Sequence, residues 1–221
     1  MTRQKKTTIC PLGGVGVGGR WKFWIWYRLL DGPKRFGELQ RLIPQASRQM
    51  LTIQLRELEQ MGIIHRHAYM QVPPKVEYSL TELGQTIEPV LRQWYTWENY
   101  YSKQVDGEFE WLMVFDGRWR FWIWYHLLSG PRRFGDLQRV LPQASRQMLT
   151  RQLRELERRG VVRREVYMQV PPKVEYSLTE LGWSLGPVMR QSYAWMRWYC
   201  EQVGLKFDWP VSDEAGVYVY Q

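Results

Sequence analysis

Arginine, glutamine and threonine side chains gather on one side of the segment that begins at Ser47. Three leucines within 51–58 recur at i, i+4 and i+7, so a helix here would turn them toward a core. Gln49, Ile53 and Arg56 would then lie on the opposite face. Arginine pairs bidentately with guanine, glutamine pairs with adenine, and a serine at a helix N-terminus suits a phosphate. This face therefore fits the reading of base edges in a nucleic-acid groove.

An equivalent set of side chains occurs 98 residues further along. Basic residues on the β-like segments after each helix would contact the phosphate backbone, which positions a protein without specifying sequence. The first set of candidate DNA-binding residues is Ser47, Arg48, Gln49, Thr52, Ile53, Arg56, Arg66 and Lys75. The second set is Ser145, Arg146, Gln147, Thr150, Arg151, Arg154, Arg164 and Lys173. In the alternative interpretation, both sets are the solvated charges of amphipathic helices.

Aromatic residues form a second group, with 13 Trp and 13 Tyr in 221 residues. Their large buried areas favour an ordinary role in core packing. The other interpretation is an aromatic cavity in which planar hydrophobic or cationic compounds stack. The candidate lining of that cavity is Trp24, Trp26, Trp97, Trp122, Trp124 and Trp195.

Histidines are too few and too scattered to indicate catalysis. The chain has three, and they show neither metal-ligand spacing nor a set of nucleophile, base and orienting group. We therefore expect no catalytic site, no metal and no cofactor. An enzyme would have to use the aromatic cavity, in which a reused binding scaffold could hold a reactive hydrophobic substrate.

A duplicated segment positions both sets of candidate residues. Residues 20–84 reappear at 118–182, and 50 of the 65 residue pairs are identical. A repeat of this length suits a small domain rather than a solenoid. We expect a first domain over 1–106, which starts with a Gly-rich arm at 1–19, a second domain over 107–204, and a tail at 205–221. The default arrangement is two similar lobes packed face to face as an intramolecular pseudo-dimer.

Within each copy, periodicity and turn residues predict the order helix, helix-turn-helix, β-hairpin and long helix. Pro44 stops a short helix, Ser47 suits the N-cap of the next helix, and Gly62 suits its C-terminal cap. The predicted segments in the first copy are helices at 21–30 and 36–43, a helix from Ser47 to Gly62, strands at 63–69 and 75–80, and a long helix capped by Thr81. The predicted fold is mainly α with small β-hairpin wings.

Composition limits the partners. The chain has 31 Lys and Arg against 22 Asp and Glu, a net charge of +9, which favours a polyanionic partner. Charged residues interrupt every apolar stretch, and the first residues lack the apolar core of a signal peptide. Two cysteines fit a reducing compartment. We therefore expect a cytoplasmic protein that does not bind membranes.

The order of these motifs resembles the HxlR family, which is related to the MarR regulators. The matching stretches are Cys10-Pro11, Gly19 to Trp21, Leu30 to Phe36, Met50 to Thr52, Leu55 to Glu59 and Val72 to Gly84, and most of them recur in the second copy. The resemblance implies a winged-helix fold and the function of a bacterial transcription factor. Members are typically homodimers, so this chain would carry both protomers as two winged-helix domains in one polypeptide.

The resemblance also gives the two cysteines a candidate role. Cys10 occupies the Cys-Pro position at which several family members sense electrophiles or oxidants, whereas the second copy has Glu108 there. In this architecture the arm of one protomer approaches the last helix of the other, so a Cys10–Cys200 disulfide would be a redox switch. The ordinary alternative is two unpaired thiols.

We therefore predict a transcriptional regulator that binds double-stranded DNA as a monomer acting as a pseudo-dimer. It would read a pseudo-palindromic operator whose half-sites lie about one helical turn, roughly 34 Å, apart. The second copy has arginine where the first has Ile53, Gln60, Met61 and His65, so it should bind more tightly. A planar aromatic effector or thiol oxidation would control binding. The alternative function is a small-molecule receptor or repurposed enzyme with a Trp-rich cavity between the lobes.

Overall fold

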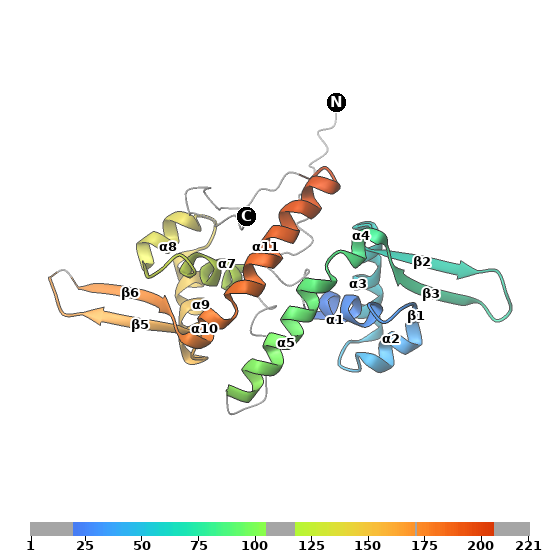
Figure 1. Ribbon diagram of the computed structural model, residues 1–221, viewed down its shortest axis with the longest axis horizontal. Coiled ribbons are helices and arrows are strands. Elements are labelled where there is room, and N and C mark those ends of the chain that lie inside the picture. Colours follow the sequence, from blue (N-terminus) through green and yellow to red (C-terminus); the bar gives the residue numbers. More distant parts are fainter. Residues whose placement is uncertain (1–19, 105–117, 171, 206–221) are drawn as a thin grey trace. The chain divides into compact units, whose positions relative to one another are not determined.

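The repeat in the sequence appears as two repeated structural units in a computed structural model, which describes residues 20–104, 118–170 and 172–205. The first unit contains α1 to α5 and the second contains α7 to α11 (Figure 1). Each unit is mainly helical and carries a small antiparallel sheet. The predicted class, two winged-helix domains with small β wings, is confirmed.

Both units follow the same order of elements. The first unit runs α1 (Arg20–Leu29), β1 (Lys34–Arg35), α2 (Phe36–Leu42), α3 (Arg48–Gln60), β2 (Ile64–Tyr69), β3 (Lys75–Leu80), α4 (Glu82–Gln85) and α5 (Glu88–Gln104). The second unit runs α7 (Arg118–Leu127), β4 (Arg132–Arg133), α8 (Phe134–Val140), α9 (Arg146–Arg158), β5 (Val162–Tyr167), β6 (Lys173–Leu178), α10 (Glu180–Ser184) and α11 (Gly186–Gln202).

Capping residues set the ends of α3 as the sequence predicts. The Ser47 hydroxyl accepts a hydrogen bond from the backbone N–H of Met50 at 3.1 Å, which satisfies one of the unpaired donors of the first turn. At the other end Gly62 adopts a φ of +70°, a conformation that costs glycine little. The same cap, Ser145 to Met148 at 3.1 Å, begins α9.

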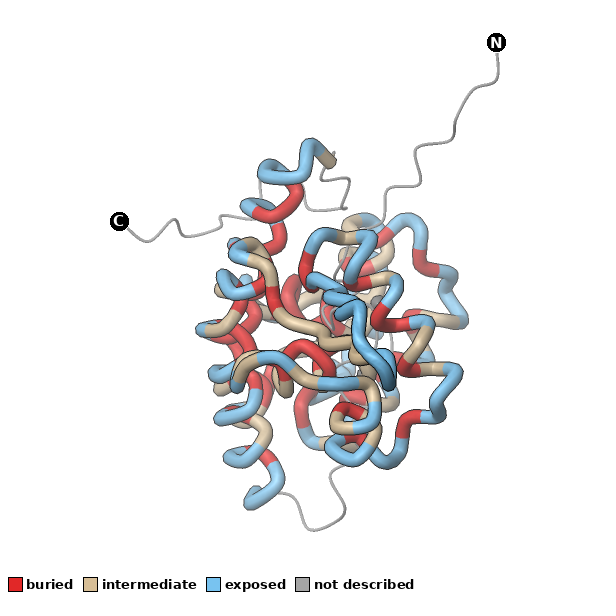
Figure 2. The backbone as a smooth tube through the Cα atoms, turned by 90° about the vertical axis from the view of Figure 1, so that its right-hand side faces the viewer, coloured by how far each residue is buried: buried red, intermediate tan, exposed pale blue. Residues whose placement is uncertain are grey.

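Apolar side chains of α1 and α3 form the core of the first unit. Phe23, Ile25 and Trp26 of α1 are fully buried, as are the three leucines that recur within 51–58. In Figure 2 such buried positions recur along the helices between exposed ones. The predicted core face of α3 is therefore confirmed.

A tryptophan joins α1 to the start of the C-terminal helices in each unit. The indole Nε1 of Trp26 donates to the carbonyl oxygen of Gly84 at 2.8 Å, and Trp124 donates to Gly182 at the same distance. A Cβ on Gly84 would lie 2.1 Å from the backbone oxygen of Ile63, so only glycine fits there. This pair explains why the repeat keeps both residue types.

The wing contains one more strand than the sequence suggested. Each sheet has the order β1-β3-β2 or its equivalent β4-β6-β5, and all pairs are antiparallel. The extra strand β1 pairs Lys34 with Tyr78 and Arg35 with Glu77. Two residues are too few to show the alternation that identifies a strand. The β2–β3 hairpin extends away from the helices of its unit (Figure 1).

The predicted long helix after Thr81 is two helices. Thr81 caps α4 by accepting from the N–H of Gly84 at 2.9 Å, and α5 begins three residues after α4 ends. Among the described helices, none combines the length and the apolar character needed to span a membrane.

Candidate nucleic-acid interface

The outer side of α3 presents the predicted polar set to solvent. Arg48, Gln49, Ile53 and Arg56 are exposed, while the half-buried Thr52 donates from its hydroxyl to the backbone oxygen of Arg48 at 2.8 Å. We call these residues, together with Ser47, the first reading face. The second reading face on α9 consists of Ser145, Arg146, Gln147, Thr150, Arg151 and Arg154.

An aromatic ring supports the first arginine of each reading face. The guanidinium carbon of Arg48 lies 5.6 Å from the ring centre of Phe36, and that of Arg146 lies 5.5 Å from Phe134. A cation over an aromatic face is attracted by the ring quadrupole, so each ring restrains its arginine. Sequence reasoning missed these phenylalanines as site residues, although each one begins the helix that precedes a reading helix.

The two predicted wing lysines are engaged within their own hairpins. Lys75 Nζ lies 2.8 Å from Glu77 Oε1 and 4.5 Å from the centre of the Tyr69 ring. The hydrogen bond from Lys75 is the main cause that lowers the pKa of Glu77. Lys173 has the same arrangement, with Glu175 at 2.8 Å and the Tyr167 ring at 4.6 Å. These lysines would have to leave a carboxylate before contacting phosphate.

The two predicted wing arginines have no such carboxylate partner. Arg66 and Arg164 are exposed, and neither forms an ion pair with any residue that the structure describes. Of the predicted wing contacts, these two arginines therefore offer the more available positive charge.

Most of the extra arginines in the second unit are paired with its own carboxylates. Arg158 and Arg159 both bind Glu155, and their hydrogen bonds lower the pKa of Glu155 to about 2. Arg163 lies 3.6 Å from Glu165. Arg151, in contrast, is exposed and pairs with no carboxylate of the described residues. The added charge available on the second reading face is thus that of Arg151.

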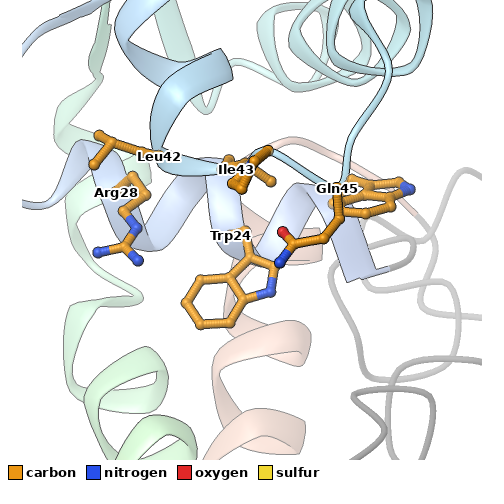
Figure 3. A pocket seen from close by; sticks show the side chains of 7 residues that line it. Trp24, Arg28, Leu42, Ile43 and Gln45 are labelled. Carbon is orange, nitrogen blue, oxygen red and sulfur yellow. The ribbon is translucent and has the colours of Figure 1, made fainter.

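The candidate tryptophans occupy different environments. Trp26, Trp122 and Trp124 are completely buried, and Trp97 and Trp195 on the long helices are buried as well. Trp24 is partly exposed and lines a cavity of about 310 Å³ in the first unit (Figure 3). The cavity lining is Trp21, Trp24, Arg28, Leu42, Ile43, Pro44 and Gln45. A ligand-binding role for the six tryptophans stays a prediction.

Of the two candidate thiols, the structure describes Cys200. It is buried, and burial, with a smaller contribution from Glu201, raises the pKa of its thiol, which lowers the fraction of reactive thiolate at neutral pH. Cys10 and the Gly-rich arm at 1–19 lie outside the described residues, as does most of the tail. In the described ranges no cluster of His, Cys, Asp and Glu could hold a metal ion.

Comparison with known protein families decides the relationship that this geometry suggests. The model of the HxlR-like helix-turn-helix family matches residues 16–106 and again residues 114–204. The chain belongs to the HxlR-like helix-turn-helix family. The two matches confirm that it carries two HxlR-like domains in tandem, as the repeat predicts.

Several relatives are named as HTH-type transcriptional regulators. YdeP of Bacillus subtilis is 53% identical over 90 residues, which cover 41% of this chain and 70% of YdeP. YkvN of the same organism is 49% identical over 96 residues, which cover 42% of this chain and 81% of YkvN. Each match therefore spans less than half of the tandem HxlR-like chain.

Two solved structures that resemble parts of this chain are those of regulators. The oxidized form of the redox regulator HypR is 52% identical and covers 40% of this chain and 90% of its own, with a TM-score of 0.38. The reduced form of the transcriptional regulator YodB from B. subtilis is 39% identical and covers 41% and 88%, with a TM-score of 0.37.

Proposed function

We propose that the chain regulates transcription by binding double-stranded DNA sequence-specifically through both reading faces. The observation that carries this proposal is the pair of solvent-exposed Arg–Gln faces, each at the start of a capped helix. Such a helix enters the major groove with its first residues at the base edges. The net charge of +9 and the wing arginines supply attraction to the phosphate backbone. Names of the relatives support regulation over catalysis.

The proposed operator is an imperfect palindrome bound by one chain. The two domains, at 1–106 and 107–204, would each take one half-site, because each carries its own reading face and wing. The half-sites would differ in sequence, since Ile53 of the first face corresponds to Arg151 of the second. Arginine favours a guanine or a phosphate where isoleucine favours a thymine methyl.

Control of DNA binding belongs to the same proposal. The raised pKa of Cys200 gives little support to this thiol as the attacking partner, so a switch would depend on Cys10. The cavity beside Trp24 supports control by a small molecule instead. It also supports a receptor function, although this cavity lies within the first unit and contains one of the six candidate tryptophans, Trp24.

Selection of bound duplexes from a random pool, followed by fluorescence anisotropy, tests the proposal. We expect an enriched pseudo-palindrome and a loss of about tenfold or more in affinity for Gln49→Ala or Gln147→Ala, because each glutamine offers a bidentate base contact. Arg92→Ala is the matched control, because Arg92 on α5 is exposed but pairs with Glu88 at 2.7 Å. No enrichment, or equal losses for all three variants, would refute sequence-specific binding by these faces.

A further inference from the structure

The cavity of the first unit has the size and the walls of a small-molecule site. Its volume of about 310 Å³ is at the lower end of the range of about 300–1,000 Å³ for ligand pockets, which suits a compound of one or two rings. Trp21, Trp24 and Arg28 come from α1, and the remaining residues come from the end of α2 and the turn that precedes α3. Two indole rings and the side chains of Leu42 and Ile43 provide flat and apolar contact area.

One charged group in this cavity, Arg28, has no ion-pair partner among the residues that the structure describes. The guanidinium carbon of Arg28 lies 5.4 Å from the centre of the Trp24 ring. Its Nε atom is buried and has no hydrogen-bond partner, and no carboxylate of the described residues pairs with the side chain. An arginine is always charged and only donates hydrogen bonds, so a buried, unpartnered guanidinium nitrogen favours an anionic acceptor. Figure 3 shows Arg28 and Trp24 projecting to the same side of α1, with Gln45 beside the indole.

The second unit does not reproduce this chemistry. His126 stands in the place of Arg28 and is 1% exposed, and Trp122 in the place of Trp24 is fully buried. Three of the seven lining positions differ between the units, since Leu42 and Ile43 correspond to Val140 and Leu141. The anion-seeking, accessible arrangement therefore belongs to the first unit.

We propose that this cavity binds a planar aromatic carboxylate, with its ring against Trp24 and its carboxylate on Arg28, and that binding changes the DNA affinity of the first reading face. The route is short, because the lining residues Ile43, Pro44 and Gln45 lead directly to Ser47, the N-cap of α3. A ligand wedged against this turn shifts the first residues of the reading helix. The effect on DNA rests on the proposed function, whereas the binding site does not.

Titration calorimetry of the full chain without DNA tests the site. We expect 2-naphthoate to bind with one site per chain, and its neutral analogue 2-naphthylmethanol to bind about tenfold more weakly or not at all, because the charge-assisted hydrogen bond is lost. Arg28→Gln and Arg28→His should each weaken the binding of 2-naphthoate by a similar factor. Arg41→Gln is the control, because Arg41 is an exposed arginine of the same unit outside the lining.

Equal binding of the acid and the alcohol on the unmodified chain would overturn the anion site, whatever the variants do. Two sites per chain, or no effect of Arg28→His, would overturn its assignment to the first unit.

Fluorescence anisotropy with a selected duplex then tests the coupling between the cavity and DNA binding. We expect 2-naphthoate to change the affinity for the duplex at least threefold in the unmodified chain and not in Arg28→Gln. Arg28-dependent binding with unchanged DNA affinity would overturn the coupling alone, and a chain that binds no duplex would overturn the proposed function alone.

Discussion

The two units connect their first helix to the reading helix by different chemistry. In the first unit the buried Lys22 forms an ion pair with Glu57 at 2.7 Å. In the second unit the corresponding Arg120 donates to the side-chain oxygen of Gln152 at 2.6 Å, and Glu155, the counterpart of Glu57, binds arginines of its own region instead. A few substitutions have thus exchanged the polar partners while the helices stay the same.

The arginines of the second unit show that the number of charged residues in a sequence differs from the number that are available for binding. The second unit gains arginines at four positions near its reading face and wing, yet three of them are paired with carboxylates of the same unit. Arg151 remains to separate the two faces. At the reading faces themselves, the predicted tighter binding of the second unit therefore depends on one side chain.

The largest effect should be common to both units. Gly84→Ala places a Cβ 2.1 Å from the backbone oxygen of Ile63, and Gly182→Ala places one 2.3 Å from that of Val161. Each variant should therefore destabilise its unit by about 3 kcal/mol or more. Urea denaturation followed by circular dichroism measures the loss. Gly37→Ala is the control, since a Cβ there meets nothing within 4 Å and should be neutral or slightly stabilising. A loss of stability for only one of the two variants would show that the Trp26–Gly84 and Trp124–Gly182 contacts are not equivalent.

The ion pair of the first unit should give the next largest effect. Glu57→Gln leaves the buried ammonium of Lys22 without its carboxylate, which should cost about 2 kcal/mol, below the range of fully buried pairs because Glu57 is 42% exposed on its side chain. Glu155→Gln should cost well under about 1 kcal/mol, because its arginine partners can turn to solvent. The same urea titration measures both variants. Equal losses would remove the contrast between the two units.

Exchange of the residues at one position should transfer DNA affinity between the faces. Arg151→Ile should weaken binding to a selected duplex about tenfold. It should also reduce the slope of log affinity against log salt concentration by about one. Ile53→Arg should change both quantities in the opposite direction. Arg158→Gln should change affinity much less, because Arg158 is already paired with Glu155. Anisotropy at several salt concentrations measures all three. An effect of Arg158→Gln as large as that of Arg151→Ile would contradict the role of internal pairing.

A last contrast between the units concerns Glu98 on α5, whose counterpart in the second unit is the buried Met196. Burial raises the pKa of Glu98 to about 8, so the folded chain holds a proton that the unfolded chain releases near the ordinary value of 4.5. The contribution of this group to the free energy of unfolding therefore falls as the pH rises from about 4.5 to about 8, and then levels off.

Glu98→Gln should remove that part of the pH dependence, so its stabilising effect should grow from about pH 4.5 and level off above about pH 8. Urea midpoints between pH 5 and 9 measure it against the unmodified chain, with Glu88→Gln as the control on the exposed side of the same helix. A parallel pH dependence in Glu98→Gln and the unmodified chain would show that Glu98 ionises normally.

Sequence reasoning found the elements that depend on local signals. Ser47 and Gly62 mark the two ends of α3 through capping and a positive φ, and the leucine spacing identifies its buried side. It missed β1, because a strand of two residues exists only through its pairing with Tyr78 and Glu77. Such a contact between distant segments leaves no periodicity in the sequence.

The candidate site shows the same division. The exposed reading faces follow from helical periodicity, whereas the pairing of Lys75 with Glu77 depends on how the hairpin brings them together. Arg28 was missed because it lies in a helix that reads as scaffold. One signal could have pointed to it, since the substitution of Arg28 by His126 is one of only two differences between the helices α1 and α7.

The joint between Trp26 and Gly84 limits how such a duplicated chain can evolve. A side chain at this glycine would collide with the carbonyl oxygen of Ile63. A replacement there therefore destabilises the whole unit instead of altering its surface alone. Replacements on the solvent side of a helix carry no such penalty. After duplication, the surfaces of the two units can therefore diverge in what they bind. The buried Trp–Gly contact on which the folding of each unit depends must stay unchanged in both.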